Sequence, residues 1–305
     1  MKDQAAKLAA QGVFVGTSSW KYEGWLGQLY DPQRYSYRGK FAKSRFQRDC
    51  LGEYGEVFQT VCVDAAYYDF PREENLRRLA SQVPPAFQFG FKVTDVVTLK
   101  QYPNLARFGS RAGQPNPDFL NADRFVNAFL KPCEAIRAQV GVLIFEFSRF
   151  WPVAYKQGRD FVGDLDQFLA KLPSGWPYAV EIRNRQWLQL EYFACLARHR
   201  VTHVFNSWDA MPAVSEQLEM AGSFTNSELV AARLLLKPGR NYEEAVKAFQ
   251  PYGKVQEPNP AVREAATGLI RRGATAGEKA KTFIYVNNRL EGNALETIAA
   301  MAGSF

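Results

Sequence analysis

The sequence predicts an α/β protein built as a single TIM-type (β/α)8 barrel. Eight short apolar segments with the character of β-strands alternate with helical segments along the chain. Several of these strands end in charged or amide side chains, as strands do when they converge on one polar site. No second compositional block divides the 305 residues, of which 47% are hydrophobic, so one large domain accounts for the length. A doubly wound open sheet is the alternative, disfavoured because Gly16-Thr17-Ser18 alone is not the Gly-rich turn of that fold.

Each predicted strand is a run of apolar residues bounded by polar or turn-forming residues. The strands are expected at residues 13–20 (where the strand runs into a hydroxyl-rich turn), 58–64, 87–93, 141–147, 178–183, 201–206, 229–236 and 281–287. The alternation is cleanest in the third of these, where phenylalanines occupy one side and Gln88, Gly90 and Lys92 the other. A strand covered by helices would turn its phenylalanines outward and its small or polar groups into the barrel.

Helices are expected in the intervals between these strands. They cover residues 41–54, 72–82, 119–138, 159–172, 188–198, 258–272 and 294–301. The third helix is expected to be interrupted or capped near Pro132. Residues 96–118 are rich in Gly, Pro and Asn and predict a long loop. Residues 1–12 are expected to form an N-terminal tail, and residues 13–305 the single domain.

The strand at residues 178–183 carries the clearest functional signal. Its alternation places Glu181 and Arg183 on the face opposite to Ile182. Charged side chains are stable on one face of a strand only where they face water or partners in a shared cavity. We therefore expect Glu181 and Arg183 to lie at the barrel mouth, at the same end as Lys92 and Asn287.

Polar side chains collect at the carboxyl ends of the other strands too, where TIM barrels hold their active sites. The complete set is Ser18, Asp64, Lys92, Glu146, Glu181, Arg183, Asn206, Arg233 and Asn287. In one interpretation Glu181 and Glu146 act as general acid and base, Asp64 is a third catalytic carboxylate, and the three cations clamp an anion. In the other, the six charges form a closed ion-pair network that plugs the mouth. We favour the first, because buried ion pairs stabilise a protein less than apolar packing does.

Aromatic residues follow the first strand in a short loop. Trp20 and Trp25, together with Tyr22 and Tyr30, suit a loop that lines a ligand. They equally suit a loop that covers the core. The first interpretation makes both tryptophans candidate ligand contacts.

Several common chemistries find no support in the sequence. His199 is expected to end a helix and His203 to lie early in its strand, which disfavours zinc catalysis through histidines. The HExxH, Walker and GxSxG motifs do not occur. We expect no cofactor and assign no metal ligands, although Asp64, Glu146 or Glu181 would suit Mg²⁺.

The composition bears on partners and location. A formal net charge of +7 permits attraction to nucleic acid or another polyanion, but we find neither a basic run nor a known motif for specific binding. The four cysteines lie far apart without a CxxC pair, which is typical of a reduced, intracellular protein. Residues 1–11 lack the apolar core of a signal peptide, and no run approaches the roughly 18 apolar residues of a membrane span. We expect a cytoplasmic protein with no membrane segment and of undetermined oligomeric state.

The chain also resembles a known family. Residues 15–25, with the sequence VGTSSWKYEGW, followed by Tyr30-Asp31-Pro32, are similar to the opening signature of the YecE-like family, domain of unknown function 72. The resemblance continues through residues 58–71, 87–92, 141–147, 179–187 and 285–288, with Gly292 and Ala294. It spans nearly the whole chain and implies a TIM-type barrel, but no established reaction.

The chain departs from the family pattern at several strand ends. Cys62 and Asp64 stand where the family usually has Glu and Asn, and Glu146 stands where it has Gln. Leu235 and Leu236 occupy the place of a histidine that the family often carries. The shared pattern is kept at Lys92, Glu181, Arg183, Arg233, Asn287 and Asn288.

Two classes of function follow from these residues. The first is an enzyme, a hydrolase or lyase, that uses Glu146 or Glu181 on a small anionic or sugar-like ligand. The second is a non-catalytic binder of nucleic acid or another polyanion. The expected ligand contacts are Ser18, Trp20, Trp25, Lys92, Arg183, Asn206, Arg233, Asn287 and Asn288.

Overall fold

A closed barrel of eight parallel strands forms the centre of the protein, as a computed structural model covering residues 1–277 and 279–303 shows. The order around the barrel is β1-β10-β9-β8-β7-β6-β5-β4, and the pairing of β1 with β4 closes it. The strands are β1 (Val13–Thr17), β4 (Thr60–Val63), β5 (Gln88–Lys92), β6 (Val140–Phe147), β7 (Tyr178–Ile182), β8 (Thr202–Ser207), β9 (Leu229–Leu234) and β10 (Lys281–Val286). The predicted TIM-type barrel is confirmed, and each predicted strand overlaps one of these eight.

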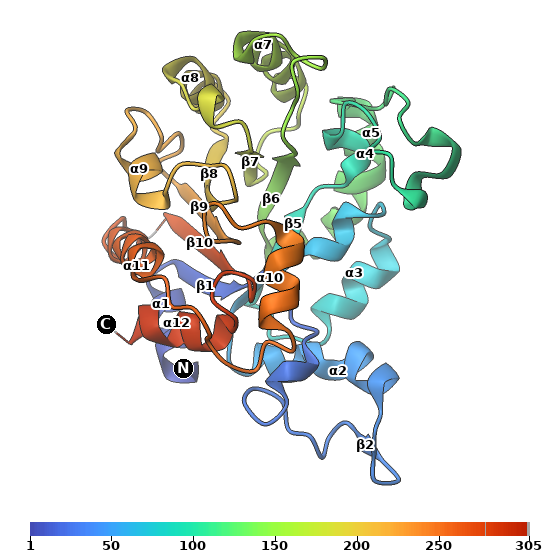
Figure 1. Cartoon of the computed structure of the whole chain (residues 1–305), viewed down its shortest axis with the longest axis vertical. Helices are drawn as coiled ribbons and strands as arrows, with labels where there is room; N and C mark the ends of the chain where they lie inside the picture. The colour runs from blue at the N-terminus through green and yellow to red at the C-terminus, as the bar shows by residue number, and fades with distance from the viewer. Residues whose placement is uncertain (278, 304–305) are drawn as a thin grey trace.

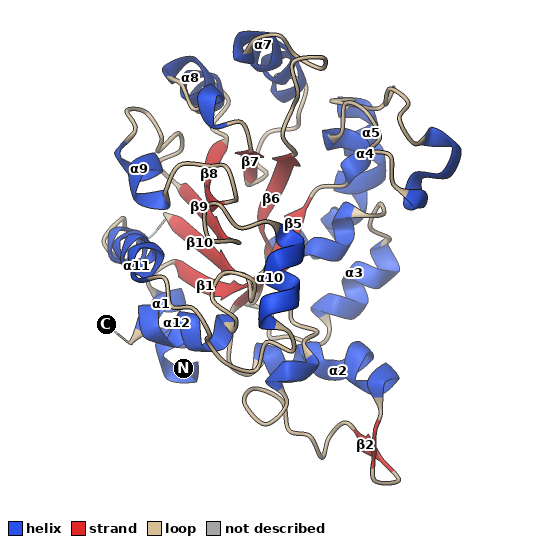
Figure 2. Cartoon of the chain, in the orientation of Figure 1, coloured by secondary structure: helices blue, strands red, loops and turns tan. Residues whose placement is uncertain are grey.

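Helices surround the barrel on all sides (Figures 1 and 2). They are α1 (Lys2–Ala10), α2 (Lys43–Gly55), α3 (Glu73–Ala80), α4 (Asp95–Thr98), α5 (Ala122–Phe125), α6 (Lys131–Cys133), α7 (Gly158–Leu169), α8 (Leu190–Arg198), α9 (Val214–Glu219), α10 (Tyr242–Phe249), α11 (Pro260–Ala274) and α12 (Ala294–Ala302). Outside the barrel sheet, β2 (Ser36–Tyr37) and β3 (Lys40–Phe41) form a small antiparallel hairpin. Within the described ranges, none of the helices is both long and apolar enough to cross a membrane.

Some helical segments differ from the sequence prediction. The expected helix at 119–138 is divided into α5, a π-helical turn at Val126–Leu130, α6 and a 3-10 segment at Glu134–Gln139. Helix α10 was not predicted at all. Residues 2–10 of the expected N-terminal tail form α1, and its Leu8 is buried in the apolar core.

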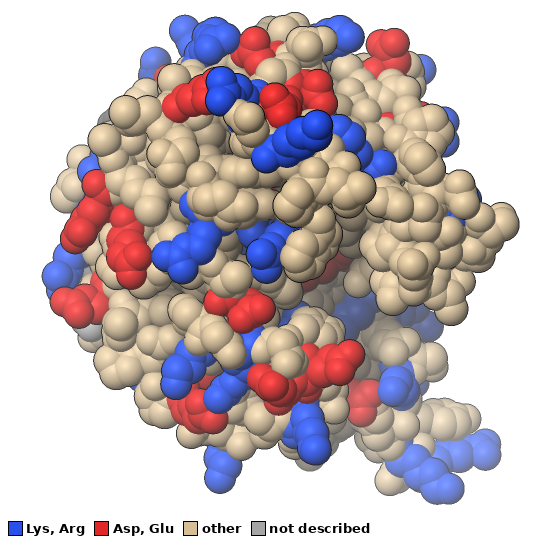
Figure 3. Space-filling model, turned by 45° about the horizontal axis from the view of Figure 1, so that its top comes forward, with Lys and Arg blue, Asp and Glu red and all other residues tan. Residues whose placement is uncertain are grey.

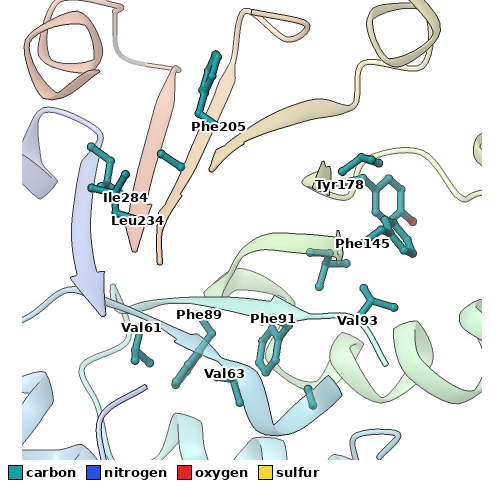
Figure 4. Close-up of a cluster of buried hydrophobic side chains, with 14 of the residues drawn as sticks. Val61, Val63, Phe89, Phe91, Val93, Phe145, Tyr178, Phe205, Leu234 and Ile284 are labelled. Atoms are coloured by element: carbon teal, nitrogen blue, oxygen red, sulfur yellow. The ribbon is translucent and has the colours of Figure 1, made fainter. Parts of the chain in front are cut away.

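The alternation of the strands sorts side chains into two apolar layers. Outward-facing residues pack between the barrel and the helices, among them Phe89 and Phe91 on β5 and Phe145 on β6 (Figure 4). Inward-facing residues such as Ile144 and Tyr285 form a separate cluster inside the barrel. The predicted orientation of the β5 phenylalanines is therefore confirmed.

Glycines make room inside the barrel for neighbouring groups. The Tyr285 hydroxyl contacts the Thr60 hydroxyl at 3.2 Å and lies directly over Gly90. A Cβ on Gly90 would lie only 2.3 Å from this hydroxyl. A Cβ on Gly16 would lie 2.2 Å from the carbonyl oxygen of Thr60. Both glycines are thus required by close packing beneath the mouth.

A buried histidine makes acid stability testable. Burial lowers the pKa of His203 from 6.5 to about 3, while its Nδ1 lies 3.2 Å from the Tyr192 hydroxyl. The pKa of His203 is lower in the folded than in the unfolded protein, so protons bind preferentially to the unfolded state. The contribution of the neutral His203 imidazole to the free energy of unfolding is therefore complete above pH 6.5 and is lost as the pH falls toward 3. We expect His203 to account for a loss of about 2 kcal/mol between pH 7.5 and pH 5. Denaturant unfolding across this range should show a shallower pH slope for His203→Gln; an identical slope in both proteins would contradict the prediction.

Candidate active site at the carboxyl end of the barrel

Each of the eight barrel strands presents a polar residue at its last inward position or just beyond it. These residues are Ser18, Asp64, Lys92, Glu146, Glu181, Asn206, Arg233 and Asn287. They follow from the alternation, because the inward residues one step below them form the apolar interior cluster. The structure therefore brings the predicted strand-end residues to one end of the barrel.

Three of the charged residues form a buried triad: Arg233, Glu146 and Glu181. Nη1 of Arg233 donates to Glu146 Oε2 at 2.8 Å and to Glu181 Oε2 at 2.7 Å. Each of these side chains is at most 3% exposed. The triad links β6, β7 and β9 in the centre of the mouth.

The other three charged residues, Asp64, Lys92 and Arg183, form an outer group that reaches solvent. Their side chains are 32%, 13% and 11% exposed, respectively. Lys92 Nζ and Arg183 Nη2 contact the same Glu146 oxygen, Oε2, at 2.7 and 2.8 Å. Asp64 makes a longer contact, 3.3 Å, with Arg233 Nη2. All three predicted cations are thus paired with carboxylates, and the outer group is held in place from below by the triad.

The three carboxylates differ in their ion pairs and in their exposure to solvent. Burial raises the pKa of Glu146, but Arg183, Lys92 and Arg233 outweigh this effect and hold that pKa well below its ordinary value. Glu146 is therefore ionised at neutral pH and is unsuited to donate a proton. Glu181 is fully buried, with one oxygen on Arg233 and the other on Arg183. These contacts favour Asp64, the most exposed carboxylate, over Glu146 and Glu181 as an acid or base.

Two aromatic rings hold the outer cations. The Tyr67 ring centre lies 3.6 Å from Lys92 Nζ, and the Trp208 ring centre lies 3.6 Å from Arg183 Cζ. Such cation–π contacts restrict long side chains and stabilise their charge. Neither ring was among the predicted site residues, although both follow predicted strands directly and the turns after strands carry site residues in this fold.

The predicted amide residues fix the backbone around the mouth. Asn287 Oδ1 accepts the Arg289 N–H at 3.0 Å, and Asn288 Oδ1 accepts the Ala294 N–H at 2.8 Å. The Asn206 amide donates to the Ile182 carbonyl at 3.3 Å. Buried polar atoms without a protein partner, in the part of the chain that is described, include Ser18 Oγ, Asn206 Oδ1, Arg233 Nε and Asn288 Nδ2. Since buried polar atoms are nearly always paired, these four atoms favour a hydrated or ligand-binding mouth.

Trp20 and Trp25 lie in the apolar core. Trp25 is fully buried and packs against Tyr22 and Tyr30, with ring centroids 4.8 and 6.3 Å away. The Tyr30 hydroxyl donates to the Trp20 carbonyl and folds the loop back on itself. Trp20 itself lines a small cavity beside α2. The loop therefore covers the core, and contact of its tryptophans with a ligand stays a prediction.

Helix α10 packs over the mouth and lies in front of the strands in Figure 1. Its Ala245 and Phe249 cluster with Leu236, and Trp208 and Tyr22 pack against this cluster. Trp208 in turn covers Arg183. The connection between β9 and α11 therefore borders the outer group.

Two cavities lie at opposite ends of the barrel. One of about 620 Å³ is lined by Val140 and Lys281, at the amino ends of their strands and away from the charges. Another, of about 360 Å³, begins two residues beyond Glu146 at Ser148 and is lined by Phe150 and Trp151. The second cavity lies at the carboxyl end of the barrel, and so does one of about 600 Å³ that is lined by Val63 and Phe91.

The residues closest to a metal-binding arrangement lie elsewhere. Among the described residues, Asp166, Cys195 and His199 place their ligand atoms within 4.8 Å of one another, between α7 and α8. Arg198 and His199 both contact the same Asp166 oxygen, at 2.9 and 2.7 Å. A cation would have to compete with Arg198 for that oxygen. The mouth carboxylates considered for Mg²⁺ likewise each contact an arginine.

Comparisons with known proteins agree with this architecture. A family model described as "Protein of unknown function DUF72" matches residues 14–305. A crystal structure of a DUF72 family protein from Enterococcus faecalis V583 aligns with a TM-score of 0.62 and 16% identity over 96% of each chain. One from Thermotoga maritima MSB8 aligns with a TM-score of 0.55 and 20% identity over 95% of this chain and 96% of the other. A search of curated proteins gave no significant match.

Proposed function

The chain belongs to the DUF72 family, whose description names no activity, and from the residues at the barrel mouth we propose that it is an enzyme acting there. Its reaction class is a hydrolase or lyase, and its ligand is a small anionic or sugar-like molecule. The outer group is the observation that supports this proposal: one carboxylate and two cations reach solvent where TIM barrels place their active sites. The fold by itself indicates no activity, since the same barrel hosts many unrelated activities.

In this proposal Lys92 and Arg183 bind the anionic group of the ligand. The Arg183 guanidinium matches carboxylate and phosphate oxygens in a planar, two-point geometry, and Lys92 adds a compact charge. Both contact Glu146 Oε2 and are covered by an aromatic ring, so their positions are set before a ligand arrives. The apolar cavity that begins at Ser148 would receive the uncharged part of the ligand.

Asp64 is the proton-transfer group in this proposal. Its carboxylate would accept a proton from an attacking water in a hydrolase, or from a carbon beside the ligand's anionic group in a lyase, and return it to the leaving group. The Cys62 thiol donates to Asp64 Oδ1 at 3.6 Å and orients it. Burial raises the pKa of Cys62 well above its usual range, so this thiol stays protonated and is not a nucleophile itself.

Anion binding tests the proposal before any substrate is known. Phosphate, sulfate and citrate are titrated into the protein, and unfolding and calorimetry report the affinity. A bound anion at 100 times its Kd should stabilise the fold by about 2.7 kcal/mol. Arg183→Lys keeps the charge but loses the two-point geometry, and we expect its anion affinity to fall about tenfold. The exposed Arg185, two residues further along, provides the control Arg185→Lys.

Two results would count against the enzyme proposal. If none of the anions binds the wild-type protein, the six charges act as the structural plug that the sequence also allowed. If Arg183→Lys and Arg185→Lys lose affinity equally, the anion binds outside the mouth. Mass spectrometry of small molecules that co-purify with the protein would then identify the natural ligand class directly.

A further inference from the structure

The β2–β3 hairpin and the start of α2 concentrate positive charge. Residues 33–48 contain six Lys or Arg residues and no Asp or Glu. No two of these six residues are consecutive, so they form no basic run, and aromatic residues lie between them. In Figure 1 the β2 end projects from the body, and blue side chains project at the corresponding place in Figure 3.

The tip of the hairpin combines an exposed ring with two cations. Tyr37 is 57% exposed and lies opposite Lys40 in the strand register. The Arg38 guanidinium lies 5.3 Å from the Tyr37 ring centre. Arg38 has φ 52° and Gly39 has φ 73°, as a two-residue hairpin turn requires. A left-handed turn position normally favours Asn or Gly, so an arginine there has a backbone cost that a binding role would explain.

Some of the basic residues of the hairpin and α2 form ion pairs and others do not. Lys43 pairs with Glu23 at 3.1 Å, Arg34 pairs with Glu56 at 3.2 Å, and Arg48 pairs with Asp49 at 2.8 Å. In the described ranges, no ion pair is formed by Arg38, Lys40 or Arg45. The net positive charge is therefore located toward the tip.

A small basic cavity adjoins the base of the hairpin. It has a volume of about 230 Å³ and lies beside α2 and α3. Its cationic lining residues are Lys21, Arg48 and Arg78, and Trp20 and Gln82 also line it. The side-chain oxygen of Gln82 is buried without a hydrogen-bond partner in the described structure, and as an acceptor it suits an N–H donor. Within the described ranges Lys21 and Arg78 form no ion pair, so these two cations can attract an anionic group to the cavity.

We propose that this hairpin surface, made of Tyr37, Arg38, Lys40, Lys21 and Arg78, binds single-stranded nucleic acid. Proteins of that class combine cations that follow the phosphates with an aromatic ring on which an unpaired base stacks. A duplex keeps its bases stacked inside and would leave the Tyr37 ring without a partner. The site is built from β2, β3, α3 and the loop after β1, and it contains none of the strand-end residues of the mouth, so it is independent of the proposed enzyme activity.

Fluorescence anisotropy with labelled oligonucleotides tests this proposal. Labelled dT20 and rU20 and a 20-base-pair duplex are titrated with the full-length protein at 50 and 200 mM salt. Each phosphate contact contributes about −0.7 to the slope of log K against log salt for single strands. If three of the cations contact phosphates, the slope is about −2, and binding is roughly twentyfold weaker at the higher salt concentration.

Three variants separate the contributions. Arg38→Gln/Lys40→Gln should make the slope shallower by about 1.4, the value for two lost phosphate contacts. Tyr37→Ala should weaken binding about tenfold without changing the slope, because stacking does not depend on salt. Lys131→Gln/Lys171→Gln removes the same charge from two exposed positions outside the hairpin, one in α6 and one just beyond α7, and is the matched control. All substituted side chains are exposed, so the melting temperatures should stay unchanged.

Each of three outcomes would overturn the proposal. The first is an equal loss of binding in the hairpin variant and the control, which would indicate general attraction by net charge. The second is equal affinity for the duplex together with no effect of Tyr37→Ala. The third is no oligonucleotide binding, with association instead to phosphatidylserine vesicles that depends on the hairpin, which would indicate a membrane surface.

Discussion

Glu181→Gln is expected to lower the free energy of unfolding by about 3–5 kcal/mol. Glu181 is fully buried, and its two oxygens contact Arg233 at 2.7 Å and Arg183 at 3.2 Å. Replacing the carboxylate by an amide keeps the shape but leaves Arg233 without one of its two buried acidic partners. Denaturant unfolding at pH 7 measures the loss. The control is Glu264→Gln, at an exposed position of α11, which should change stability by less than about 0.5 kcal/mol.

The same measurement on Asp64→Asn separates the triad from the outer group. Asp64 is 32% exposed and lies 3.3 Å from Arg233, so water screens its charge, and a loss of about 1 kcal/mol or less is expected. Once a substrate is known, this variant should lose activity about a hundredfold or more. A loss below about 1 kcal/mol for Glu181→Gln would contradict the division into two groups. It would indicate a hydrated mouth and return Glu181 to the candidate acid–base residues.

Gly16→Ala is expected to destabilise the fold by about 3 kcal/mol or more, or to prevent folding. The new Cβ would lie 2.2 Å from the Thr60 carbonyl oxygen and 2.9 Å from its methyl carbon. The carbonyl belongs to the backbone of β4, where β1 and β4 close the barrel, and it cannot rotate away as a side chain could. Thermal and denaturant unfolding of the purified variant measure the effect.

Gly163→Ala is the matched control for this prediction. Gly163 lies within α7, and nothing stands within 4 Å of the position of a Cβ there. An alanine in a helix interior is more favourable than glycine, so this variant should gain about 0.5–1 kcal/mol. If Gly16→Ala unfolds like the wild type, the closure between β1 and β4 is looser than the structure indicates.

The barrel and its polar end could be predicted because both depend on local alternation. In a strand, every second side chain faces the same way, so the places of Glu146, Glu181 and Arg233 follow from counting along each strand. The same counting gives the outward phenylalanines of β5 and the inward Gly90. These are properties of single strands and need no knowledge of how distant segments meet.

The pairing of the charges and the folding of the loops could not be predicted in this way. Which carboxylate contacts which cation depends on four strands meeting, and Glu146 is the partner of Lys92, Arg183 and Arg233 only in the closed barrel. Trp25 was expected near a ligand because its position in a loop after β1 does not show that the loop folds back into the core. Helix α10 is short and obtains its stability from packing on Trp208 and Tyr22, which the sequence pattern does not contain.

Because α10 and the charged residues of the mouth lie on different elements, protein engineering could change ligand access and the charge network separately. The six charges stand on the barrel strands and the residues directly after them, whereas α10 meets the mouth through apolar packing on Trp208 and Tyr22. In the proposed enzyme, the connection from β9 to α11 would therefore limit the size of the ligand, and the strand ends would carry the reaction. Grafting a different connection at this place would change ligand selection and leave the charge network intact. Homologues could diversify by the same route, through insertions that never disturb the barrel.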